Sequence, residues 1–156
     1  MDARKEQFVE RMGLMSEDDG LPRIAGRIFG YLLLTPGECA LDELAAELNV
    51  SRASISNDAR RLTAMGLIER RGRPGDRRDY YRIAPDAFRR SIERRIDGLR
   101  RFHALIDEAG ALGIDDPEVR TRLGVWDEAH VLMVDAFQAL LARIDGAPQG
   151  TGSGGN

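Results

Sequence analysis

The fold of this chain is decided by the segment Leu41–Arg82. It opens with the sequence Leu41-Asp-Glu-Leu-Ala-Ala-Glu-Leu-Asn-Val-Ser-Arg-Ala-Ser-Ile-Ser-Asn-Asp-Ala-Arg-Arg-Leu62. Apolar residues recur at helical spacing on both sides of Asn49-Val50, and Asn49 tolerates the left-handed backbone of a tight turn. Ser51 is a good N-cap for the second helix. The segment therefore predicts a helix-turn-helix, with helices at about 41–48 and 52–65.

A predicted β-hairpin follows the second helix directly. Residues 67–71 alternate as a strand, and residues 79–83 form the returning strand. The intervening stretch Gly72-Arg-Pro-Gly-Asp-Arg-Arg78 contains four turn-forming residues and three arginines, which predicts a basic loop. A helix-turn-helix followed by such a hairpin is a winged helix-turn-helix.

Helices are predicted on both sides of this module. Upstream, they cover about 2–14 and 22–34, and Gly26 and Gly30 mark a face that meets another backbone closely. Downstream, a long helix starts at Pro85 and carries an apolar seam from Phe88 to Ala109 at a mean spacing near 3.5, typical of a coiled coil or bundle. The last helix is expected to bury the row Trp126, Ala129, Met133, Ala136, Leu140 and Ile144.

The expected fold class is thus mainly α with a small β-hairpin wing, flanked by long N- and C-terminal dimerisation helices. Four segments are predicted: an N-terminal helix at 1–20 for packing or dimerisation, the winged helix-turn-helix at 21–84, a helical dimerisation region at 85–146 and a disordered, glycine-rich tail at 147–156.

The composition is that of a cytoplasmic globular protein. The 156 residues are 42% hydrophobic and 31% charged, and one cysteine excludes an internal disulfide. No apolar run is long enough for a membrane span. The net charge of −3 is unevenly distributed: residues 51–82 carry 9 basic and 4 acidic side chains, against 5 and 10 in residues 1–50. A basic island in an acidic protein indicates a polyanionic partner such as DNA.

The second helix of the motif presents small polar residues and then arginines opposite its apolar face. Such a face suits the major groove, because Ser and Asn can read base edges and Arg can read guanine or hold phosphate. A solvated helix face, or a surface that docks a protein partner, remains the alternative. The predicted DNA-binding residues are Ser51, Arg52, Ala53, Ser54, Ser56, Asn57, Arg60 and Arg61 on the helix, with Arg73, Arg77 and Arg78 on the wing.

These features resemble the MarR-type winged-helix regulators, and among them the GbsR-like branch. The resemblance rests on Gly20–Leu34, Leu41–Leu48, Val50–Asn57 and the wing sequence Pro74-Gly-Asp-Arg-Arg-Asp-Tyr-Tyr81. It implies a homodimeric transcriptional regulator, and a repressor is expected before an activator. The two recognition helices of such a dimer read the half-sites of a palindromic operator in double-stranded DNA. It also implies a small-molecule or oxidant effector near the junction of the dimerisation and DNA-binding parts, and a nucleoid location when bound.

Other residues carry weaker signals. Cys39 has no neighbouring His or Lys to activate it, so we expect an inert thiol. Two histidines, His103 and His130, lie on different predicted helices without a nearby cysteine, so no metal site is expected. Aromatic residues could supply an effector cage for a quaternary amine, with core packing as the alternative: Tyr31, Phe102, Trp126 and Phe137. No catalytic motif or cofactor-binding loop is present, so no enzyme activity and no cofactor are expected.

Overall fold

The computed structural model describes residues 1–146, and the chain divides into two compact units, Met1–Ser91 and Ile92–Asn156. The disordered tail predicted at 147–156 lies outside the described residues. Among residues 1–146, no helix has the length and apolar character needed to cross a membrane.

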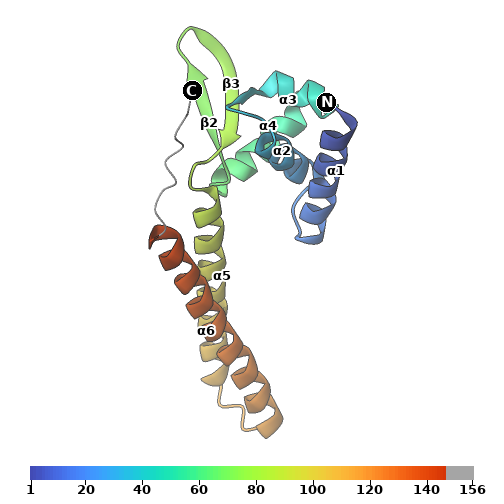
Figure 1. Cartoon of the computed structure of the whole chain (residues 1–156). Helices are drawn as coiled ribbons and strands as arrows, with labels where there is room; N and C mark the ends of the chain where they lie inside the picture. Colours follow the sequence, from blue (N-terminus) through green and yellow to red (C-terminus); the bar gives the residue numbers. More distant parts are fainter. Residues whose placement is uncertain (147–156) are drawn as a thin grey trace. The chain divides into compact units, whose positions relative to one another are not determined.

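The first unit is a winged helix-turn-helix preceded by two helices (Figure 1), as the sequence predicts. The hairpin β2–β3 projects beyond the helices of this unit in Figure 1. Its elements in chain order are α1 (Ala3–Asp18), α2 (Arg23–Leu33), β1 (Cys39–Ala40), α3 (Leu41–Glu47), α4 (Arg52–Ala64), β2 (Ile68–Arg73) and β3 (Asp76–Ile83).

The core of this unit is built from the apolar faces that the helical spacing predicts. Leu44, Ile55 and Leu62 are fully buried and pack with Ile28 of α2 and Ile68 of β2. The turn between α3 and α4 also follows the sequence prediction, because Asn49 adopts a positive φ of 51°. These contacts fix α4 on the core by one face and leave its other face exposed.

Helices α1 and α2 meet along the glycine face expected from the sequence. A Cβ on Gly26 would lie 2.5 Å from the backbone oxygen of Met12 and 2.2 Å from Ser16 Oγ, and a Cβ on Gly30 would lie 2.9 Å from Met12 Cβ. Helix α1 extends to Asp18, beyond the predicted end near Leu14, and includes the buried Ser16. Burial of this turn against α2 overrides the break that the polar run 16–20 suggests.

The sheet corrects the predicted wing. It is antiparallel with strand order β1-β3-β2, and the two-residue strand β1 was not predicted. Arg73 pairs with Asp76, so the connection between β2 and β3 is only Pro74-Gly75, with Gly75 at φ +79°. The seven-residue loop expected at 72–78 is therefore wrong. Proline and glycine at the two central positions are enough to reverse the chain, and the arginines around them lie in strands.

The second unit is a helical hairpin. Helix α5 (Ala87–Gly110) begins in the first unit and continues into the second, where α6 (Pro117–Gly146) runs alongside it. The Phe102 and His130 rings stack with centroids 4.2 Å apart, and His103 Nδ1 hydrogen-bonds the Asp127 carboxylate. The start of α6 at Pro117 is capped by Asp116, whose Oδ1 accepts a hydrogen bond from the Glu118 N–H at 2.8 Å.

Apart from Ile144, the buried row of α6 is not the predicted one. Trp126, Met133 and Leu140 are 53%, 40% and 37% exposed, whereas His130 is buried. The less exposed side chains recur at alternating steps of 4 and 3: Leu123, Asp127, His130, Val134, Phe137, Leu141 and Ile144. Two of these are polar, which is why the apolar pattern led to the neighbouring row. The row from Trp126 to Leu140 is thus an exposed apolar face in this single chain.

Candidate nucleic-acid interface

Helix α4 carries the predicted recognition face on its exposed side. Arg52, Ala53, Asn57, Arg60 and Arg61 are exposed, and Ser54 and Ser56 are half-buried at the edge of this face. The opposite side is anchored by Ile55, Ala59 and Leu62. The helix-turn-helix therefore brings all the α4 residues named from the sequence to one surface.

The start of α4 is held in place by a side-chain cap. Ser51 Oγ accepts a hydrogen bond from the Ser54 N–H at 3.1 Å, as the sequence predicts, and the two hydroxyls lie 2.9 Å apart. Arg52 Nε is 2.9 Å from Asp42 Oδ1 of α3. This ion pair links the first turn of α4 to the preceding helix and orients the guanidinium.

Two further arginines of α4 are oriented by groups on the same helix. Arg60 Nη2 donates to Asn57 Oδ1, and Arg60 Nε donates to the Ser56 carbonyl at 3.3 Å. Arg61 Nε lies 3.7 Å from Asp58 Oδ1. Burial raises the pKa of Asp58, and the neighbouring Arg61 opposes that rise. The side-chain oxygen of Asn57 thus accepts from Arg60, and within residues 1–146 its amide N–H groups have no acceptor.

The wing is organised around Tyr80, a residue that the sequence prediction missed. The Arg73 guanidinium lies 4.0 Å from the Tyr80 ring centroid and that of Arg78 lies 5.3 Å from it. The Tyr80 hydroxyl donates to Asp76 Oδ2 at 2.7 Å, and Arg78 binds the same carboxylate at 2.8 Å. These bonds from Arg78 and Tyr80 hold the pKa of Asp76 well below its usual range. Arg73 is also bound to Glu38 at 2.6 Å, so the wing arginines are held in defined positions.

A hollow of about 260 Å³ joins the recognition helix to the wing. Its lining includes Arg52 at the start of α4 and Arg77 and Arg78 of β3, together with Leu41, Asp42 and Asp79. Three arginine residues that are up to 26 positions apart in sequence thus line one hollow. Arginines are strong phosphate donors, so this arrangement suits a nucleic-acid backbone.

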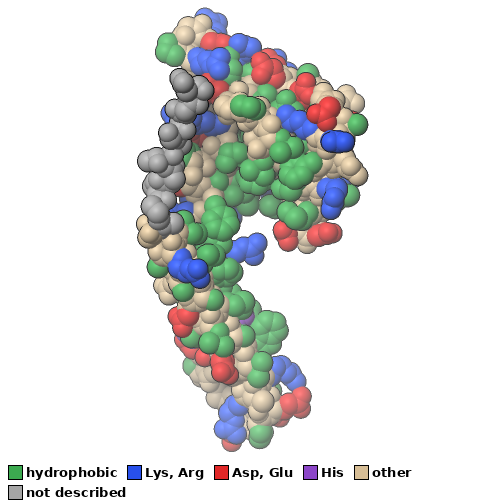
Figure 2. Space-filling model, viewed as in Figure 1, with side chains coloured by type: hydrophobic (Ala, Val, Ile, Leu, Met, Phe, Trp, Pro, Cys, Tyr) green, Lys and Arg blue, Asp and Glu red, His purple; other side chains and the backbone are tan. Residues whose placement is uncertain are grey.

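Most arginines of the basic island carry a carboxylate partner. Figure 2 shows Arg and Lys side chains interspersed with Asp and Glu over the first unit. The partners include Glu38 and Asp42 from outside the island, which the sequence prediction did not assign. Within residues 1–146, Arg60 has no carboxylate partner and Arg77 makes no hydrogen bond or ion pair.

Comparisons with known proteins identify the family. The MarR family model matches residues 19–79. The HTH-type transcriptional regulator MmpR5 of Mycobacterium tuberculosis (strain ATCC 25618 / H37Rv) is 42% identical over 139 residues, which cover 88% of this chain and 84% of that protein. The chain belongs to the MarR family. It is a winged-helix transcriptional regulator that binds DNA, and the resemblance of its sequence to MarR-type proteins is confirmed.

Two further relatives match this MarR-family chain over different shares of its length. A crystal structure described as a transcriptional regulator superimposes with a TM-score of 0.78 at 35% identity, covering 91% of this chain and 98% of that chain. The putative HTH-type transcriptional regulator YvaV of Bacillus subtilis (strain 168) is 24% identical over 88 residues, which span 56% of this chain and 50% of that protein.

The predicted effector residues fall into both units. In the first unit, Tyr31 is buried, and Nζ of Lys5 lies 4.0 Å from the centroid of its ring. In the second, the Phe102 and Trp126 rings are 5.9 Å apart, and Phe137 is half-buried in the α6 row. The hairpin thus brings two of the four aromatic rings together.

Proposed function

We propose that this MarR-family chain is a homodimeric, sequence-specific repressor. Helix α4 enters the major groove of double-stranded DNA, and the β2–β3 wing follows the adjacent phosphates or minor groove. The observation that carries the proposal is the hollow in which Arg52 of the recognition helix and Arg77 and Arg78 of the wing converge.

The residues take distinct roles in this proposal. Asn57, Ser54 and Ser56 read base edges, and Ala53 allows close approach. Arg60 and Arg61 contact guanine or phosphate further along the groove. Phosphate positioning falls to Ser51, Arg52, Arg73, Arg77 and Arg78.

Dimerisation is supported by the exposed apolar row of α6. Trp126, Met133 and Leu140 are each at least 37% exposed in the single chain, and a second copy of the chain would bury them. In this assignment residues 21–84 bind DNA, residues 85–146 dimerise, and residues 1–20 support the DNA-binding part. A twofold dimer reads a palindromic operator, with half-sites roughly 34 Å apart.

The proposal also includes membership of the GbsR-like branch. It further includes a cytoplasmic location, with the protein on the nucleoid when it is bound to an operator. The Leu21-Pro-Arg23 segment and the wing sequence Gly75–Tyr81 support the branch. A small-molecule effector is assigned to the aromatic pair Phe102 and Trp126, whose rings lie 5.9 Å apart.

Selection of bound duplexes from random DNA tests the proposal. The wild-type protein should enrich a palindromic site, and Asn57→Ala should change the enriched sequence more than it changes affinity for unrelated duplexes. Gel-shift titrations at two salt concentrations provide the second measurement, because phosphate contacts make binding salt-dependent. No enriched sequence and no salt-sensitive binding would refute the proposal and favour a winged-helix module that docks a protein instead.

A further inference from the structure

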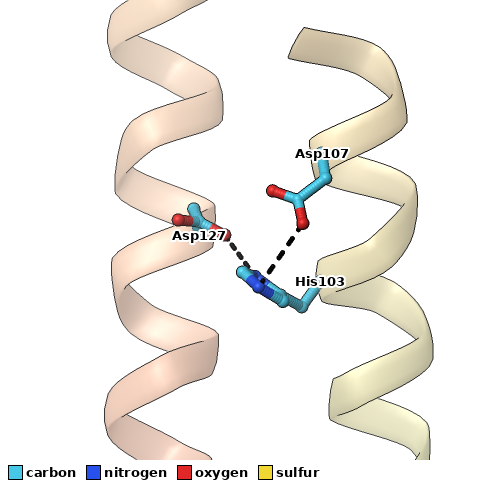
Figure 3. Close-up of side chains that lie close together, drawn as sticks. All are labelled: His103, Asp107 and Asp127. Carbon is cyan, nitrogen blue, oxygen red and sulfur yellow. Dashed lines mark hydrogen bonds and ion pairs between the residues drawn. The ribbon is translucent and has the colours of Figure 1, made fainter. Parts of the chain in front are cut away.

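We propose that His103, Asp107 and Asp127 form a binding site for a divalent transition-metal ion, with Zn²⁺ the best match, which links α5 to α6 within the hairpin. The three side chains point toward one another from the two helices (Figure 3). One ligand atom from each lies within 4.8 Å of the other two.

The placement of the three groups follows from the helical geometry. His103 and Asp107 are four residues apart and therefore share one face of α5. Asp127 lies in the half-buried row of α6 that faces this helix. The cluster therefore contains ligands 24 positions apart in sequence, which the spacing of the two histidines could not reveal.

The hydrogen bonding of His103 leaves a position for a cation. Nδ1 of His103 hydrogen-bonds the carboxylate of Asp127, and Nε2 lies 3.6 Å from Asp107 Oδ2. A neutral imidazole has only one N–H, so the ring nitrogen opposite Asp127 presents a lone pair toward a second carboxylate. A metal ion bound by one ring nitrogen and by both carboxylates would remove this unfavourable arrangement, with coordination replacing the hydrogen bond between His103 and Asp127.

The donor set and exposure favour a transition metal. One imidazole and two carboxylates suit Zn²⁺, whereas Mg²⁺ and Ca²⁺ prefer oxygen ligands throughout. The side chains of His103, Asp107 and Asp127 are 38%, 68% and 37% exposed, so an ion can enter and water can complete its coordination. His130 is not part of the site, since its Nδ1 hydrogen-bonds the Trp126 carbonyl at 2.6 Å.

The alternative is an imidazolium that donates to both carboxylates and takes up no metal. Calorimetric titration of the full-length protein with ZnCl₂, and absorption spectroscopy with Co²⁺ as a substitute, distinguish the two. We expect one ion per chain and a Co²⁺ spectrum with ligand-field bands. Absence of stoichiometric uptake by the wild-type protein would overturn the proposal.

Matched variants show whether the ion occupies this cluster. Asp107→Asn keeps the hydrogen bond between His103 and Asp127, so it should leave the hairpin folded while weakening Zn²⁺ binding about 10-fold or more. His103→Gln should abolish binding and the Co²⁺ bands. The adjacent Glu108→Gln and Glu128→Gln remove a carboxylate from the same helices outside the cluster and should bind like the wild type. Equal affinity in Asp107→Asn and Glu108→Gln, with helical content unchanged by circular dichroism, would place the ion elsewhere and contradict the site.

Discussion

Arg77 and Arg78 are adjacent in sequence but differ in their surroundings. Arg78 is held by Asp76 and lies near the Tyr80 ring. Arg77 has no polar partner among residues 1–146 and is exposed beside the same hollow. The charge of Arg77 can therefore reach a phosphate without breaking an internal ion pair, whereas Arg78 must leave its carboxylate or bind DNA together with it.

We predict that Arg77→Ala lowers affinity for every duplex by a similar factor and reduces the slope of log K against log salt by about 1, because one phosphate contact is lost. The double variant Arg77→Ala with Arg78→Ala should weaken binding further. Fluorescence anisotropy at several salt concentrations, with operator and unrelated DNA, measures both quantities. An unchanged slope in the double variant would exclude the wing from the interface.

Cys39 is the single cysteine, and its thiol is buried against Glu43. Burial, followed by the hydrogen bond to Glu43, raises the pKa of Cys39 to about 12. The native thiol should therefore stay protonated and react with a disulfide reagent at pH 8 only as fast as the protein opens. In denaturant the same thiol, with an ordinary pKa of about 8.5, should react rapidly. Rapid reaction of the native protein would contradict a buried, unreactive thiol at Cys39.

At the scale of elements, α1 and α2 pack closely because Gly26 has no side chain. We predict that Gly26→Ala destabilises the protein by about 1–3 kcal/mol, because the new methyl group would overlap the backbone oxygen of Met12. Gly124→Ala is the matched control: nothing lies within 4 Å of a Cβ there, so it should stabilise α6 by about 0.5–1 kcal/mol. Chemical denaturation measures both values, and a neutral Gly26→Ala would contradict the packing.

The helix-turn-helix could be predicted from sequence because its local signals agree. The apolar spacing, the left-handed Asn49 and the Ser51 cap all indicate the same boundaries. The wing boundaries could not be predicted, because exposed arginines pair across a hairpin without any apolar alternation. The contacts of Tyr80 with Asp76, Arg73 and Arg78 depend on how the two strands pair, and a single sequence does not specify that pairing.

The hairpin of α5 and α6 shows a second limit of prediction. Hydrophobic periodicity assigns Phe102 and Trp126 to the buried rows, yet His103 and Asp127 meet between the helices. Polar groups that satisfy one another across two helices are indistinguishable, in a single sequence, from polar groups that face water. The proposed metal site therefore depends on contacts that only the folded hairpin creates.

At the scale of the whole molecule, the exposed apolar row of α6 needs a partner surface. We predict a dimer in sedimentation equilibrium, and we expect Met133→Glu to shift it toward monomer, because a charge would be buried in the interface. Leu112→Glu is the control, since Leu112 is 72% exposed in the turn between the helices. A wild-type monomer at micromolar concentration, or equal shifts in both variants, would contradict dimerisation through this row.

The carboxylates beside the arginines also affect selectivity. A surface that already holds Glu38, Asp42 and Asp76 against its guanidinium groups carries its own counterions. For the interface we propose, binding is then an exchange of carboxylates for phosphates, and fewer salt ions are released than the number of arginines suggests. Flexible polyanions such as heparin should therefore compete poorly with operator DNA. Only a rigid duplex holds several phosphates in the positions needed to displace Glu38, Asp42 and Asp76 from their arginines at the same time.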